Sequence, residues 1–290
     1  MRLGAVIITM GNRPDDLRAL IDSVVRQEGD PIEVVVVGNG APVTGVPDGV
    51  RTVELPENLG IPGGRNVGIE AFGPAGTDVD VLLFLDDDGL LANTDTAELV
   101  RRAFAADPEL GIISFRIADP DTGATQRRHV PRLRASDPMR SSRVTTFLGG
   151  ANAVRTKVFA EVGPLPGEFF YAHEETDLAW RALDAGWMID YRSDMVLLHP
   201  TTPPSRHAVY HRMVARNRVW LARRNLPAPL IPLYLGVWLS LTLARRPSAA
   251  GLKAWFSGFT EGWTTPCGPR RPMKWRTVWR LTRLGRPPVV

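Results

Sequence analysis

Short apolar runs alternate along the first part of the chain with segments whose apolar residues recur at helical spacing. The runs predict buried strands at Leu3–Thr9, Ile32–Val37, Val50–Leu55, Val81–Leu85 and Leu110–Phe115. The segments between them predict helices that begin at Pro14, lie between Asn58 and Phe72, and span Thr96–Ala106. This alternation predicts an α/β fold with a mostly parallel sheet flanked by helices.

The pattern then becomes less regular. Asp119–Arg143 is polar, basic and interrupted by prolines, which predicts a long loop or hairpin. After it we expect a short helix at Thr156–Val162. An aromatic run that starts at Phe169 then leads into a helix that ends at Gly186. Two short strands and a basic helix follow, at Met188–Tyr191, Met195–Leu198 and Ala208–Asn225.

Three adjacent carboxylates, Asp86, Asp87 and Asp88, follow the apolar run at Val81–Leu85. Open α/β sheets bind ligands at the carboxyl ends of their strands. Adjacent like charges also raise one another's pKa unless a cation compensates them. The turn therefore predicts either a site for Mg²⁺ or Mn²⁺ carried with a diphosphate, or a solvated acidic turn.

A glycine-rich stretch, Asn58–Gly68, opens the second predicted helix and carries Gly64 and Arg65. Its glycines allow close approach of a phosphate or sugar to free N–H groups. Its spacing matches neither the dinucleotide fingerprint nor the P-loop. A loop that serves packing alone is the alternative interpretation.

Acidic residues and one histidine supply candidate chemistry further along. Glu175, with Glu174 next, is the candidate general base, because a carboxylate beside aromatic residues can have a raised pKa. Asp177 is expected mainly to cap the helix start. His199 follows an apolar strand and is either a hydrogen-bonded core histidine or, with Asp86 and Asp88, part of a metal site.

Charge is divided unevenly along the chain. Residues 1–194 hold 19 basic and 30 acidic residues, whereas residues 195–290 hold 16 basic residues and a single acid, Glu261. The basic part includes the uncharged apolar run Leu230–Ala244 and many tryptophans interleaved with arginines. The uncharged stretch begins at Leu226, and we divide the chain there into an α/β domain, 1–225, and a basic, aromatic helical appendage, 226–290.

This appendage is typical of a segment that binds an anionic membrane surface. The alternative is a set of core helices that cap the catalytic domain. Nucleic acid is not favoured as a partner, because no recognised nucleic-acid module accompanies the basic residues. The apolar start is too short for a secretory signal, and Cys267 alone cannot form an intrachain disulfide. Together these features favour a cytoplasmic protein, peripheral on the inner face of the cell membrane.

Six motifs in order resemble family 2 glycosyltransferases of the GT-A fold, especially the bacterial rhamnosyl- and galactofuranosyltransferase-like branch. They cover roughly residues 3–225: an opening strand with Thr9 and Asn12, Asn-x-Gly-x-x-Gly-Gly-x-Asn-x-Gly at Asn58–Gly68, Asp-x-Asp at Asp86/Asp88, Phe-Leu-Gly-Gly-Ala at Phe147–Ala151, Glu-Glu-x-Asp-Leu-x-x-Arg at Glu174–Arg181, and His199.

The resemblance implies a nucleotide-diphosphate sugar donor, a divalent metal ion and a lipid-linked or cell-envelope glycan acceptor. It places Thr9, with Asn12 and Asn39, at the nucleotide, and Gly64 and Arg65 near the donor. It places Asp86 at the ribose or the metal, and Asp87 is counted with the donor-binding residues. It makes Asp86, Asp88 and His199 the metal-side ligands. Glu175 corresponds to the base of a single in-line displacement with inversion.

One departure from the family pattern concerns the pocket for the base of the nucleotide. The second strand ends in Val37-Gly38-Asn39, where family members commonly carry an acid that contacts the base. The nucleotide and sugar therefore stay open, as do the acceptor and the oligomeric state. Two rival functions remain: a metal-dependent nucleotidyl- or phosphotransferase, and a non-catalytic protein that binds sugar nucleotides.

Overall fold

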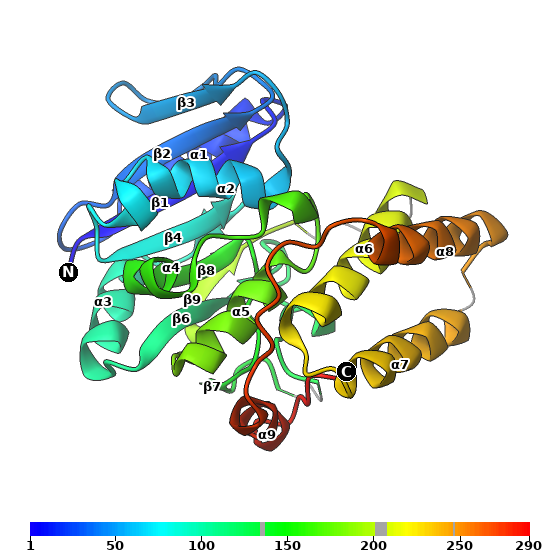
Figure 1. The fold of residues 1–290 in the computed structure, drawn as a ribbon. Helices are drawn as coiled ribbons and strands as arrows, with labels where there is room; N and C mark the ends of the chain where they lie inside the picture. Colours follow the sequence, from blue (N-terminus) through cyan, green and yellow to red (C-terminus); the bar gives the residue numbers. More distant parts are fainter. Residues whose placement is uncertain (134–136, 201–207, 246) are drawn as a thin grey trace.

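A computed structural model describes residues 1–133, 137–200, 208–245 and 247–290. Within them, nine strands form one sheet in the order β3-β2-β1-β4-β8-β6-β9-β5, with β7 paired to β9 (Figure 1). The strands are β1 (Leu3–Thr9), β2 (Glu33–Asn39), β3 (Arg51–Leu55), β4 (Val81–Asp86), β5 (Leu90–Leu91), β6 (Leu110–Ala118), β7 (Ser142–Arg143), β8 (Ala151–Arg155) and β9 (Met188–Leu198). The predicted α/β fold with a sheet flanked by helices is confirmed.

The first half of the sheet is parallel and carries the site. β1 lies between β2 and β4, and both pairings are parallel. All three strands therefore end at the same edge, where β1 ends in Thr9, β2 in Asn39 and β4 in Asp86. The apolar runs predicted as strands are almost fully buried there, because helices cover both faces.

The second half of the sheet is mixed. β8 runs antiparallel to β4 and β6, and β6 is parallel to β9. The prediction of two separate strands at Met188–Tyr191 and Met195–Leu198 is wrong, since both belong to β9. Its pairing with β6 shifts from Arg192 to Val196, which leaves a bulge of polar residues between the two apolar runs.

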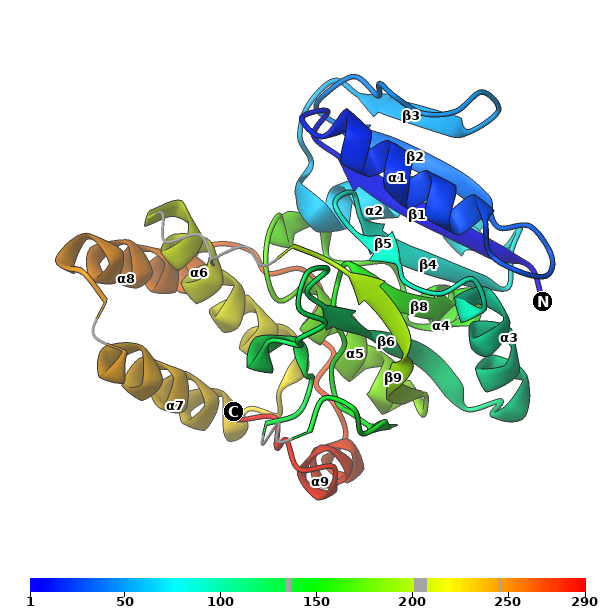
Figure 2. The same ribbon diagram turned by 180° about the vertical axis from the view of Figure 1, so that it is seen from behind.

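Helices form two layers over the sheet. On one face α1 (Pro14–Val25) and α3 (Thr96–Ala106) pack against inward-facing residues such as Ala5 and Leu83 (Figure 2). The other face packs against α2 (Gly60–Glu70), α4 (Thr156–Val162) and α5 (Glu174–Ala185). The predicted loop at Asp119–Arg143 is confirmed in most of its described residues, but its last two residues form β7, which pairs with β9; 134–136 lie outside the described residues.

Four helices form the C-terminal part: α6 (Ala208–Asn225), α7 (Leu230–Ala244), α8 (Ala249–Thr264) and α9 (Trp275–Arg283). Leu221, Tyr234 and Leu281 belong to the same hydrophobic cluster as residues of α5. Thus the region after residue 225 packs directly against the sheet-bearing part. Within the described ranges, no helix is long and apolar enough to cross a membrane.

Candidate donor and catalytic site

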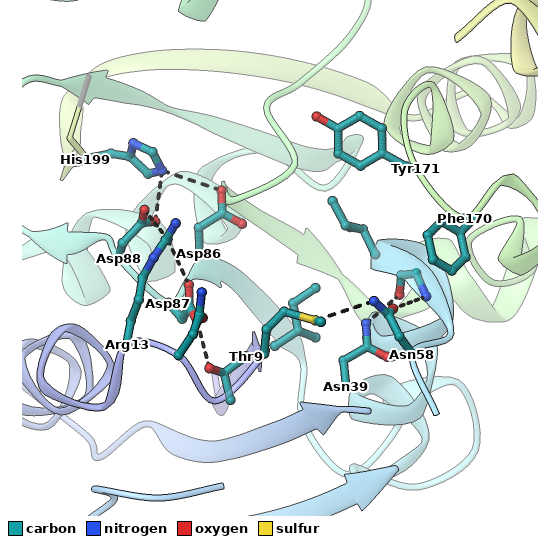
Figure 3. A pocket seen from close by; sticks show the side chains of 15 residues that line it. Thr9, Arg13, Asn39, Asn58, Asp86, Asp87, Asp88, Phe170, Tyr171 and His199 are labelled. Carbon is teal, nitrogen blue, oxygen red and sulfur yellow. Dashed lines mark hydrogen bonds and ion pairs between the residues drawn. The ribbon is translucent and has the colours of Figure 1, made fainter. Parts of the chain in front are cut away.

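A pocket of about 410 Å³ opens at the carboxyl ends of β1, β2 and β4 (Figure 3). This size suits a nucleotide-sized ligand. The pocket is bounded by the acidic turn after β4 on one side and by the aromatic loop before α5 on the other. Its lining includes predicted residues from five places in the sequence: Thr9, Asn12, Asn39, Asp86, Asp87, Asp88 and His199.

Asp88 lies between two cationic groups. Its Oδ1 is 3.0 Å from His199 Nε2, and its Oδ2 pairs with Arg13. Burial alone would raise the pKa of Asp88, but the His199 hydrogen bond and the charges of His199 and Arg13 lower it overall. The same hydrogen bond raises the pKa of His199, whose Nδ1 lies 2.8 Å from the Pro200 carbonyl oxygen. Nε2 is therefore the ring nitrogen directed at the acidic turn.

Asp87 faces the first strand. Thr9 Oγ1 donates a hydrogen bond of 2.7 Å to Asp87 Oδ2, and Arg13 lies 3.5 Å from its other oxygen. Burial raises the pKa of Asp87 despite these contacts. The hydrogen bond between Thr9 and Asp87 therefore links the end of β1 to the turn after β4 at the floor of the pocket.

Asn39 holds the glycine-rich loop. Its Nδ2 donates to the Gly60 carbonyl at 3.0 Å, and its Oδ1 accepts from the Leu59 N–H at 2.9 Å. Gly64 packs against the Asn39 side chain rather than lining the pocket. At Gly38 a Cβ would overlap the Ala41 carbonyl group, so the chain after β2 fills the place of the acid common in the family.

Arg65 joins the acidic turn to the candidate base. Its guanidinium is 3.2 Å from Asp86 Oδ1 and 3.7 Å from Glu175 Oε1, and only 5% of the side chain is exposed. A Cβ at Gly149 would overlap Glu175, and one at Gly150 would overlap Asp86. The absence of side chains at Gly149 and Gly150, just before β8, therefore leaves room for the carboxylates of Glu175 and Asp86.

Glu174 and Glu175 form an asymmetric pair at the start of α5. Burial, and then the charge of Glu175, raise the pKa of Glu174 well above its ordinary value. Burial also raises the pKa of Glu175, but Arg65 and a hydrogen bond from Glu174 oppose that rise. Because the pKa of Glu174 is raised further than that of Glu175, Glu174 is the carboxyl group of the pair that favours its protonated form, and it can donate to Glu175. Glu175 is then the carboxylate available as a base.

Asp177 lies away from the pocket. It is fully buried and accepts hydrogen bonds from Arg181 at 2.8 Å, Arg224 at 3.0 Å and Asn225 at 2.7 Å. These partners join α5 to the end of α6. Its contacts are those of a residue that fixes the helices behind the site.

Two parts of the site were missed in the sequence. Arg13 is not among the residues predicted for the site, yet it pairs with Asp87 and Asp88. Asn217 of α6 is fully buried, and its Nδ2 lies 2.7–2.9 Å from three carbonyl oxygens of residues 169–172. That loop contains Phe170, Ala172 and His173 with positive φ. Such strained backbone needs an outside support, and here it comes from a helix remote in sequence.

Asp86, Asp88 and His199 supply the oxygen and nitrogen donors that suit a divalent cation. His199 Nε2 lies 4.0 Å from Asp86 Oδ2 and 3.0 Å from Asp88 Oδ1. In the described part of the chain, no three such groups already converge on one ion position, since Arg13 and Arg65 engage the carboxylates. The donors fit a divalent cation in chemical type, and His199 Nε2 lies within 4.0 Å of both carboxylates.

The fold and this pocket define an α/β protein with an acidic, nucleotide-sized site at the strand ends. The sequence profile described as glycosyl transferase family 2 matches residues 5–163, more than half of the chain. The chain therefore belongs to glycosyl transferase family 2, and the predicted family is confirmed. No curated protein sequence matches it significantly.

Solved structures share the GT-A fold at low sequence identity. Residues 1–349 of TarS from S. aureus, in complex with UDP-GlcNAc, align with a TM-score of 0.61 and 13% identity, covering 90% of this chain and 81% of that one. GalNAc-T7 with UDP, GalNAc and Mn²⁺ aligns with a TM-score of 0.63 and 13% identity, covering 90% and 56%.

The mannosyltransferase PcManGT from Pyrobaculum calidifontis, in complex with GDP-Man and Mn²⁺, gives a TM-score of 0.57 and 17% identity, covering 91% and 76%. A longer TarS chain matches over only 40% of its length. These similarities establish the fold.

Proposed function

We propose that the protein is a metal-dependent inverting glycosyltransferase that moves a hexosyl or deoxyhexosyl group from a nucleotide-diphosphate sugar to a lipid-linked or cell-envelope glycan acceptor. The observation that carries this proposal is the link from Asp86 through Arg65 to Glu175. This link brings Asp86, which lines the donor pocket, and Glu175, the proposed base, to the same guanidinium. Two of the similar solved structures are complexes, one with UDP-GlcNAc and one with GDP-Man and Mn²⁺, and they support a nucleotide-diphosphate sugar as the donor.

In the proposed reaction, Glu175 removes the proton of the acceptor hydroxyl as that oxygen forms a bond to the anomeric carbon. The bond from the anomeric carbon to the diphosphate breaks on the opposite side, and the nucleoside diphosphate leaves with the electron pair. A Mg²⁺ or Mn²⁺ ion held by Asp86, Asp88 and His199 would offset the charge on the departing diphosphate. Arg65 keeps Glu175 oriented, and Thr9 keeps Asp87 in place at the nucleotide side.

The products of donor turnover test this assignment. Incubation with UDP-, dTDP- and GDP-sugars in Mn²⁺ is expected to release the nucleoside diphosphate slowly, with water as a poor acceptor. Quantification by liquid chromatography, with and without EDTA, gives the readout. Release of a nucleoside monophosphate instead would mean that a phosphoanhydride bond was cleaved and would favour a nucleotidyl- or phosphotransferase.

We also propose that the C-terminal helices bind the inner face of an anionic membrane. α7 is uncharged and apolar around its circumference, yet only Tyr234 and Leu235 are buried. On α9, Trp275 and Trp279 lie one helical turn apart and are 52% and 64% exposed. Exposed tryptophans beside arginines are typical of interfacial segments. The excess of basic residues after residue 194 supplies attraction to anionic lipid.

Vesicle binding checks this surface. The full chain is expected to co-sediment with vesicles of mixed phosphatidylglycerol and phosphatidylcholine, and less so with phosphatidylcholine alone or in high salt. The double change Trp275→Ser and Trp279→Ser is expected to weaken partitioning roughly tenfold. Val25→Ser, which removes an equally exposed apolar side chain from α1, is the matched control. Equal binding to both vesicle types would contradict an electrostatic membrane surface.

A further inference from the structure

A second cavity lies between α5, α6, α7 and the C-terminal segment. Its volume is about 60 Å³, and no residue lines both it and the donor pocket. A water molecule occupies about 30 Å³ in the liquid. The space therefore suits a compact group. Its polar lining includes His173, Thr176, Arg218 and Arg286.

The cationic groups here lack acidic partners. No ion pair within the described ranges involves Arg218, Arg286 or the terminal carboxylate, although other buried arginines such as Arg224 pair with acids. Arg218 is flanked instead by the Trp238 ring, 3.3 Å from its Cζ, and by the Tyr234 hydroxyl. Burial lowers the pKa of both guanidinium groups, so desolvation of these charges is costly.

Two further polar atoms at the cavity have no partner. His173 Nε2 and Trp238 Nε1 are buried, and neither atom has a hydrogen-bond partner among the residues that the structure describes. Burial, and then the charges of Arg218 and Arg286, lower the pKa of His173 well below its ordinary value. Thr176 lies in the first turn of α5, where a helix attracts negative charge. Uncompensated cations, an unused N–H and a helix start thus surround one small space.

We propose that this cavity binds a phosphate-type oxyanion, held by the guanidinium groups of Arg218 and Arg286. Such an anion offers several acceptors to a guanidinium fork and to the Trp238 N–H. The site is separate from the donor pocket, and α5, which supplies Thr176 and Trp180 to the cavity, begins with Glu174 and Glu175. The inference rests on the unpaired cations and does not depend on the proposed glycosyl transfer.

Thermal unfolding of the full chain, without nucleotide sugar, tests this site. Sodium phosphate is expected to raise Tm by a few degrees over sodium chloride of equal ionic strength. Arg218→Met and Arg286→Met should each abolish the phosphate-specific rise. In chloride, Arg218→Met is expected to unfold at or above the wild-type Tm, because it removes a poorly compensated cation.

Two control variants isolate the cavity. Arg212→Met removes an exposed arginine on the same helix that pairs with Glu261, and Arg13→Met removes the cation of the donor pocket. Both should keep the phosphate-specific rise. An Arg218-dependent rise with phenyl phosphate as well shows that the phosphate of a larger molecule enters, whereas a rise with inorganic phosphate alone assigns the site to the free ion. No rise in the wild type, or a rise that Arg218→Met retains, would overturn the proposal.

Discussion

Replacing Glu175 by glutamine is expected to lower turnover by about 10²- to 10⁴-fold, the range typical for loss of general-base catalysis. Donor affinity should change little, because Glu175 is not among the described residues that line the pocket and reaches Asp86 of that lining through Arg65. Glutamine keeps the size and one carbonyl oxygen, so Arg65 retains a partner while proton removal is lost. Steady-state release of nucleoside diphosphate, together with a donor-binding isotherm, separates the two effects.

Glu174→Gln is the matched comparison. Glu174 is favoured in its protonated form, and a glutamine N–H can replace its donated hydrogen bond to Glu175. We expect a much smaller loss than for Glu175→Gln. Wild-type turnover should fall with decreasing pH as Glu175 is protonated, at a pH above the ordinary pKa of a glutamate, because burial raises the pKa of Glu175. If Glu175→Gln kept wild-type turnover and this acid limb, Glu175 would not be the base.

Much of the fold could be predicted because its pattern is local. The buried runs at Leu3–Thr9 and Val81–Leu85 read as strands from their apolar residues alone, and α3 and α6 have the predicted bounds. β9 was divided in error because the polar residues of its bulge interrupt the apolar run. A bulge is stabilised by pairing with β6, and that neighbour is far away in the sequence.

The candidate site was predictable only in part. Asp86, Asp88 and His199 were grouped by residue type and motif order, and the structure brings them together. Arg13 was missed because a turn arginine has no local signature for its partners. Asn217 was missed because its role is to hold a strained loop from a helix more than forty residues away in sequence. Such long-range contacts depend on packing, which periodicity does not encode.

Asp88→Asn is expected to abolish metal-dependent donor binding. The change is nearly isosteric, so the hydrogen bond from Arg13 can persist, but the negative charge opposite His199 is lost. A neutral amide oxygen is a far weaker ligand for Mg²⁺ or Mn²⁺ than a carboxylate. Thr94, an exposed residue that hydrogen-bonds Glu28 away from the pocket, provides the control variant Thr94→Ala.

Thermal unfolding of wild type, Asp88→Asn and Thr94→Ala with UDP-, dTDP- and GDP-sugars, each with and without Mn²⁺, tests the central claim most directly. For one donor at about 100-fold its Kd, Tm should rise by roughly 3–6 °C in wild type and Thr94→Ala, only when Mn²⁺ is present. Asp88→Asn should show no such rise. An equal rise in Asp88→Asn, or no rise with any donor in the wild type, would contradict a metal-dependent nucleotide-sugar site at this pocket.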